Sequence, residues 1–82
     1  MRIKVTHKEL IKKLHKINYV EARMVGSHLI LVNNSFNSTI VLPIAKPKEI
    51  VAEYFLRTIR KNMIEKGILT EEEFYNLMMS ED

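Results

Sequence analysis

The spacing of hydrophobic residues changes twice along the chain and predicts a helix, three strands and two further helices. In the first segment apolar residues follow the 3.6-residue period of a helix at Leu10, Ile11, Leu14 and Ile17. Thr6 and Glu9 form a capping-box pattern, in which the threonine hydroxyl accepts from a first-turn N–H and the glutamate reaches back. We therefore expect a helix that begins after Thr6 and ends near Asn18.

The middle of the chain predicts three antiparallel strands. Polar and apolar residues alternate from Tyr19 to Val25, which is the period of a half-buried strand. The stretch from His28 to Val32 is almost wholly apolar, as expected for a central strand, and Thr39 to Leu42 form the third. Gly26-Ser27 joins the first two strands, because glycine adopts the positive φ of a tight hairpin turn. Pro43 marks the end of the third strand or an edge of the sheet, since proline donates no ladder hydrogen bond.

The last part of the chain predicts a long helix and a short one. Apolar residues at intervals of four form a core-facing stripe at Val51, Phe55, Ile59 and Met63. Pro47 is well placed near the start of the long helix, because the first turn does not need its missing N–H. Gly67 fits the left-handed position after this helix, and Thr70 to Glu73 repeat the capping box for a short C-terminal helix.

This order of elements predicts the α+β class. Helices at both ends of a strand meander cover one face of the sheet, and the other face is expected to be wetter. The central strand does not show which face is covered, because both of its faces are apolar. The two faces are His28, Ile30 and Val32 on one side and Leu29, Leu31 and Asn33 on the other. The side of the sheet that carries His28 therefore stays open.

Composition restricts the class of protein. A chain of 82 residues forms a single domain, residues 1–82, and buries roughly 60 to 65% of its unfolded surface, so any active site should be shallow. The chain has no cysteine and therefore neither a disulfide framework nor a thiolate metal site. No apolar run approaches the roughly 20 residues of a membrane span, and the N-terminus lacks the apolar region of a signal peptide. We therefore expect a cytoplasmic protein with no membrane partner.

Two features suggest a nucleic-acid partner. The formal net charge is +3, a modest bias toward anionic partners. Basic residues also recur on one side of the first helix at Lys8, Lys12, His15 and Lys16, and Lys13 widens this side. This basic face is either a solvated helix surface or a track for RNA phosphates.

His28 is the first candidate for chemistry. It opens the central strand directly after the Gly26-Ser27 turn, so it sits on a stiff element beside an exposed backbone. Histidine changes its charge near neutral pH and serves as a general acid or base. The alternative is a partly exposed strand histidine with no chemical role. His7 and His15 lie within the first helix and are weaker candidates.

These residues together resemble the HicA toxins of prokaryotic toxin–antitoxin systems, which are small ribonucleases with a fold like the double-stranded RNA-binding domain (dsRBD). The most specific mark is Gly26-Ser27-His28, with Arg23 three residues before the glycine. Further matching segments cover nearly the whole chain and are Thr6 to Ile11, Val41 to Pro43, Leu56 to Ile59 and Thr70 to Phe74. The resemblance implies a dsRBD-like fold of a helix, a three-stranded antiparallel sheet, a helix and a short C-terminal helix.

The resemblance also implies a metal-independent mRNA interferase with His28 as the catalytic residue, no cofactor and a HicB-like antitoxin that covers the histidine. A neutral imidazole takes the proton of a ribose 2′-hydroxyl as it attacks the adjacent phosphate, and the imidazolium protonates the leaving oxygen. The chain shows no compact carboxylate cluster of the kind that a two-metal nuclease uses. Basic side chains and turn N–H groups would bind the phosphates, and the expected RNA-binding residues are Lys8, Lys12, Lys16, Arg23, Gly26 and Ser27.

Some positions depart from the family pattern and keep other functions open. The family often has a basic residue at Val25 and a second histidine at Ala45, and Tyr54-Phe55 replace its usual Gly-Thr. A non-catalytic RNA-binding module of the same fold is therefore the second hypothesis. The third is a protein that binds another chain through exposed apolar side chains, for which the candidates are Phe36, Tyr54 and Met79.

Overall fold

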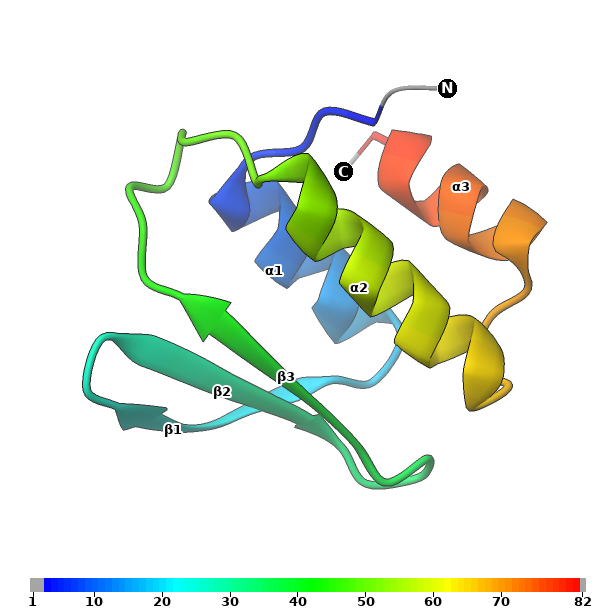
Figure 1. Ribbon diagram of the computed structural model, residues 1–82, viewed down its shortest axis with the longest axis horizontal. Helices are drawn as coiled ribbons and strands as arrows, with labels where there is room; N and C mark the ends of the chain where they lie inside the picture. The colour runs from blue at the N-terminus through cyan, green and yellow to red at the C-terminus, as the bar shows by residue number, and fades with distance from the viewer. Residues whose placement is uncertain (1–2, 82) are drawn as a thin grey trace.

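The computed structural model describes residues 3–81 and confirms the α+β arrangement (Figure 1). The elements in chain order are α1 (His7–Lys16), β1 (Val20–Val25), β2 (His28–Asn33), β3 (Ser38–Pro43), α2 (Glu53–Glu65) and α3 (Glu71–Met79). The sheet is antiparallel with the strand order β1-β2-β3, so β2 is central. All three helices lie on one side of the sheet, which makes a two-layer structure.

The local signals for helix ends are confirmed. Thr6 Oγ1 accepts from the Glu9 N–H at 3.1 Å, and Glu9 Oε1 accepts from the Thr6 N–H at 2.8 Å. Thr70 and Glu73 make the same pair of hydrogen bonds at the start of α3. Asn18, just after α1, has a φ of 74°, the left-handed conformation that asparagine tolerates at a helix stop. These features depend on residues close in sequence, which is why the pattern alone predicts them.

The long helix begins later than expected, and the prediction for Pro47 is wrong. Pro47 lies in the connector between β3 and α2, and α2 begins at Glu53. The connector is held against the N-terminal segment, where the Val51 N–H donates to the Val5 carbonyl at 2.8 Å. The Lys8 N–H donates to the Pro47 carbonyl at 3.1 Å. These bonds join residues far apart in sequence, so no local pattern reveals that they compete with helix formation.

The hydrophobic core lies between the sheet and the helices. Its buried members are Val5, Leu10, Leu14, Tyr19, Leu31, Ile40, Leu42, Val51, Leu56, Ile59, Met63, Phe74 and Met78. Register pairs Ile40 with Leu31 and Leu42 with Leu29, so these residues share the face that the helices cover. His28 alternates with them and therefore lies on the opposite, open face of the sheet.

Buried hydrogen bonds connect the layers at the end of the sheet opposite the Gly26-Ser27 turn. Ser38 Oγ donates to Asn62 Oδ1 at 3.1 Å, and the Tyr19 hydroxyl lies 2.7 Å from Ser38 Oγ. Because the single serine proton goes to Asn62, the tyrosine is the donor to Ser38. Asn33 is also buried, and its Nδ2 donates to the Ile17 carbonyl at 2.9 Å. Strands β1, β2 and β3 are thereby tied to α2 and to the end of α1.

The Tyr19 hydroxyl predicts a specific loss of stability in alkali. Burial raises the pKa of Tyr19 above its usual 10.0, and the hydrogen bond with Ser38 opposes part of that rise. The unfolded tyrosine therefore ionises at lower pH than the folded one. Its contribution to the free energy of unfolding is present below about pH 10 and is lost as the pH rises toward the folded pKa.

We expect Tyr19→Phe to lower the free energy of unfolding by about 1 to 2 kcal/mol near pH 8, because Ser38 loses its donor. Between about pH 9 and 11 the parent should lose more stability than the variant, which has no phenol to ionise. Urea unfolding of both proteins at several pH values measures the difference. Parallel declines in the two proteins would contradict the assignment.

Candidate nucleic-acid interface

His28 lies at the tip of the first hairpin and is exposed on the open face of the sheet. It is the first residue of β2 and pairs with Val25 and with Pro43. Gly26 has a φ of +59°, which favours glycine, and a Cβ built there meets no atom within 4 Å. The turn therefore presents its backbone and the imidazole to solvent without a side chain in front of them.

Arg23 lies on the same face of the sheet as His28. The register shift of β1 lies between Glu21 and Arg23, and it moves Glu21 to the other face, opposite Leu31. Arg23 and Val25 alternate regularly and pair with Ile30 and His28, so Arg23 shares the open face and is a diagonal neighbour of His28. Residues related in this way lie roughly 7 to 8 Å apart, within reach of an arginine side chain. The structure thus brings together the expected site residues of the hairpin.

The open face of the sheet is aliphatic rather than polar. Its apolar members are Val20, Val25, Ile30, Val32 and Val41. Val20, Val25 and Val41 are about half exposed, at 52, 53 and 48%. The expectation of a wetter face is confirmed at these three valines, whereas Ile30 on the same face is buried, with 7% of its surface exposed. The three strands contain no Phe, Tyr or Trp, so His28 is the one aromatic side chain that they offer for stacking on a base.

The connector between β3 and α2 links the hairpin to the beginning of α1. At one end the Ile44 N–H donates to the Ser27 carbonyl at 2.9 Å, and at the other the Lys8 N–H donates to the Pro47 carbonyl at 3.1 Å. Figure 1 shows this connector running along one side of the molecule, from the end of β3 to the start of α1. The hairpin tip and the N-terminal end of α1 therefore belong to one edge of the protein.

Two further lysines lie on this edge, and the sequence analysis missed them as site residues. Lys46 and Lys48 flank Pro47 in the connector, and both are exposed. The available signal is the Lys-Pro-Lys pattern between two predicted elements. With Arg23 and Lys8 these residues make a basic edge that begins beside His28.

The basic face expected on α1 divides into three parts. Lys8 and Lys12 are exposed in the half of the helix that meets the connector. Lys16 is exposed at the other end, beside the Ile17 carbonyl that binds Asn33 after the central strand. Lys13 is buried, with 2% of its surface exposed, and its Nζ donates to the Ser80 carbonyl at 2.6 Å. The prediction that Lys13 widens the basic face is therefore wrong, and Lys16 lies at the end of the sheet opposite His28.

The other candidate residues are not gathered at this interface. His7 lies in the first turn of α1, and His15 is exposed near its end. Glu73 caps α3, and Glu71 pairs with Arg60 at 3.2 Å, so the acidic run is used for local structure. Phe36, Tyr54 and Met79 are exposed but belong to the β2–β3 turn, the start of α2 and the end of α3. They therefore come from three separate elements.

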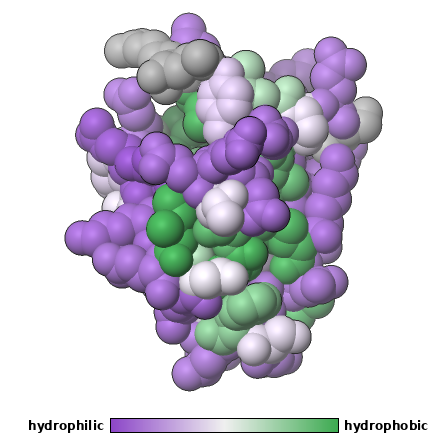
Figure 2. Space-filling model, turned by 90° about the vertical axis from the view of Figure 1, so that its right-hand side faces the viewer, coloured by the Kyte–Doolittle hydropathy of each residue, from purple (hydrophilic) through white to green (hydrophobic). Residues whose placement is uncertain are grey.

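The side of the molecule where α3 lies has a different surface. Figure 2 shows hydrophobic residues at the centre of that side, surrounded by hydrophilic ones. Within residues 3–81 no three His, Asp or Glu side chains are grouped so that they could hold a metal ion. None of the helices in the described part of the chain is long and apolar enough to cross a membrane.

Comparison with known proteins adds no relative. No family model, curated protein or solved structure matches this chain. The resemblance to HicA toxins therefore depends on sequence motifs alone. The basis for a functional proposal is the geometry of His28, Arg23 and the basic edge.

Proposed function

We propose that this protein is the toxin component of a toxin–antitoxin system, a metal-independent endoribonuclease that cuts mRNA with His28 as its catalytic residue. The observation that carries the proposal is the position of His28. It is exposed at a hairpin tip, shares a sheet face with Arg23, and stands at the end of a lysine-bearing edge. A solvent-exposed imidazole beside cationic groups suits a polyanionic substrate that brings its own nucleophile.

The proposed reaction uses the ribose 2′-hydroxyl of RNA. Neutral His28 accepts the 2′-hydroxyl proton as that oxygen attacks the adjacent phosphorus, and the bond to the 5′-oxygen breaks. The imidazolium then returns the proton to the 5′-oxygen, which leaves as a 5′-hydroxyl, while the other fragment keeps a 2′,3′-cyclic phosphate. Arg23 and the N–H groups of the Gly26-Ser27 turn would stabilise the charge that develops on the phosphate.

The proposed partner is a HicB-like antitoxin that covers the open face of the sheet. Exposed aliphatic residues of this extent are typical of protein contact surfaces, and here Val25 and Val41 lie on the same face as His28. A protein seated there would cover the imidazole and would exclude RNA. Both this partner and mRNA are cytoplasmic, which is the location that the proposal requires.

A non-catalytic RNA-binding module of the same fold is the second candidate. It is favoured by the surroundings of His28, because within residues 3–81 no hydrogen bond or ion pair orients its imidazole. Catalytic histidines are commonly held by such a partner. The basic edge alone would still bind RNA backbones by charge and shape.

We expect His28→Ala to lower RNA cleavage about 100-fold or more, because it removes the general acid and base. The melting temperature should change by less than about 3 °C, since the side chain is exposed and supports no core contact. Cleavage of a labelled RNA and thermal melting measure the two effects.

His15→Ala is a matched control, because it removes an exposed histidine from α1 and should leave cleavage unchanged. Cleavage by the parent should also persist in EDTA, since the reaction uses no metal. If purified His28→Ala protein cuts RNA at the parent rate, the catalytic assignment fails. If neither protein cuts RNA and both bind it, the RNA-binding module is the better description.

Substitutions on the open face of the sheet should lower the affinity for the antitoxin. Val20→Lys combined with Val41→Lys should weaken the complex with the HicB-like antitoxin at least about tenfold, because two half-exposed aliphatic contacts become charged. Ile64→Lys, at a partly exposed position on α2, is the control and should bind normally. Co-expression and pull-down measure recovery of the complex. A parent chain that is harmless alone and recovers no partner would argue against the toxin assignment.

A further inference from the structure

A lysine-lined pocket lies between α1, the connector and the end of α3. Its volume is about 590 Å³, and the C-terminal residues Met78 to Glu81 form one wall. Five lysines line it, namely Lys4, Lys8, Lys12, Lys13 and Lys48. Four of them lie within residues 4–13, and folding adds Lys48 from the connector, which is far away in sequence.

The acidic residues in this pocket do not balance the lysines. Glu9 and Glu81 are the carboxylates of its lining. Glu9 Oε1 is already bound to the Thr6 N–H at 2.8 Å in the capping box. Among the described residues the four exposed lysines of the lining, Lys4, Lys8, Lys12 and Lys48, outnumber its two carboxylates, and charges that share a concave surface raise the local concentration of an anion.

Lys13 holds the wall of the pocket in place. Its side chain is 2% exposed, and its Nζ donates to the Ser80 carbonyl at 2.6 Å. This hydrogen bond joins the C-terminal segment to α1 across the base of the pocket. The exposed Lys8, Lys12 and Lys48 are then left to contact a ligand.

We propose that this pocket binds a backbone phosphate of the RNA strand that is cut at His28, an inference that rests on the proposed function. Lys8 and Lys48 belong both to the pocket and to the basic edge that reaches the Ser27 carbonyl through Ile44. A strand that follows this edge from the hairpin therefore arrives at the pocket. The pocket is an anchor for the strand at a distance from the reacting phosphate.

The pocket recognises the charge of RNA phosphates and not the base sequence. No aromatic side chain lines the pocket, so it offers no platform on which a base would stack. Lysine is a compact point charge with rotatable donors, which suits phosphate oxygens in many orientations. The pocket should bind the phosphates of different RNA sequences with similar strength.

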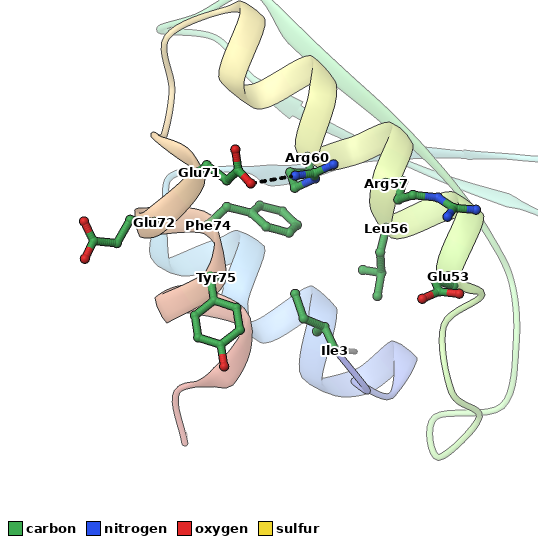
Figure 3. Close-up of a pocket in the computed structure, with 9 residues that line it drawn as sticks. All are labelled: Ile3, Glu53, Leu56, Arg57, Arg60, Glu71, Glu72, Phe74 and Tyr75. Carbon is green, nitrogen blue, oxygen red and sulfur yellow. Dashed lines mark hydrogen bonds and ion pairs between the residues drawn. The ribbon is translucent and has the colours of Figure 1, made fainter. Parts of the chain in front are cut away.

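The larger cavity of the protein does not have this character. It lies between α2 and α3, has a volume of about 770 Å³ and is shown in Figure 3. Arg57 and Arg60 line it together with Glu53, Glu71 and Glu72, and Arg60 is paired with Glu71 at 3.2 Å. Its carboxylates outnumber its arginines, so a phosphate would be repelled there.

The test measures RNA affinity in a His28→Ala background, where the strand stays intact. Lys12→Gln with Lys48→Gln removes two exposed lysines of the pocket, and Lys61→Gln with Lys66→Gln removes the same charge from the far end of α2. For a single strand of about 12 nucleotides at about 100 mM salt, the pocket pair should lose roughly tenfold affinity. Its slope of log affinity against log salt should fall by about 1.4, since each lost phosphate contact contributes about 0.7.

The control pair should change RNA affinity less than about twofold. In proteins that keep His28, the pocket pair should raise KM for the long RNA, because the anchor binds ground state and transition state alike. If both pairs of substitutions weaken binding equally, the pocket is not the anchor, even where His28-dependent cleavage is intact.

A second measurement separates failure of the pocket from failure of the proposed function. Inorganic phosphate is titrated into the full chain while backbone amide NMR signals are followed. Saturable shifts confined to residues 4–13, 48 and 78–81 support the anion site even if the protein cuts no RNA. The same titration with Lys12→Gln and Lys48→Gln should show no saturable shift. Absence of such shifts in the parent overturns the proposal.

Discussion

Burial of one face of the sheet is the constraint on which the rest of this structure depends. Both faces of β2 are apolar, so the choice is made by the size of the side chains and by buried hydrogen bonds. The covered face of β2 and β3 carries Leu29, Leu31, Ile40 and Leu42, whereas the open face carries Ile30 together with the smaller Val32 and Val41. Since each buried methylene contributes about 0.8 kcal/mol, covering these residues stabilises the fold more than covering valines would. The hydrogen bonds of Tyr19, Ser38 and Asn62 then fix the sheet against α2.

The same choice leaves His28 on the open face and determines what surrounds it. Regular pairing of β1 with β2 places Arg23 on that face, and Val25 and Val41 flank the histidine on the neighbouring strands. A cationic group, an imidazole and an aliphatic surface are thereby combined without a deep cleft. In the proposed function RNA and antitoxin compete for one surface, so inhibition requires no change of conformation.

The connector between β3 and α2 extends this surface toward the helices. Its hydrogen bonds to Ser27, Val5 and Lys8 hold it along one edge of the molecule. The connector also places Lys48 in the lysine-lined pocket, whose other walls come from α1 and the end of α3. A small domain cannot enclose an elongated substrate, but it can bind one along an edge. In the proposed function RNA is cleaved at the hairpin, and a backbone phosphate is bound at the pocket.

The sequence by itself determined the order of elements, both capping boxes, the Gly26-Ser27 turn and the exposure of Lys8, Lys12 and Lys16. Each of these depends on spacing or on residues within a few positions of one another. Only the tertiary structure decided the face of His28, the side of Arg23, the late start of α2 and the burial of Lys13. These depend on contacts between distant residues, such as the Lys13 hydrogen bond to the Ser80 carbonyl. A local pattern contains no information about such contacts, because their free energy arises only when the layers pack together.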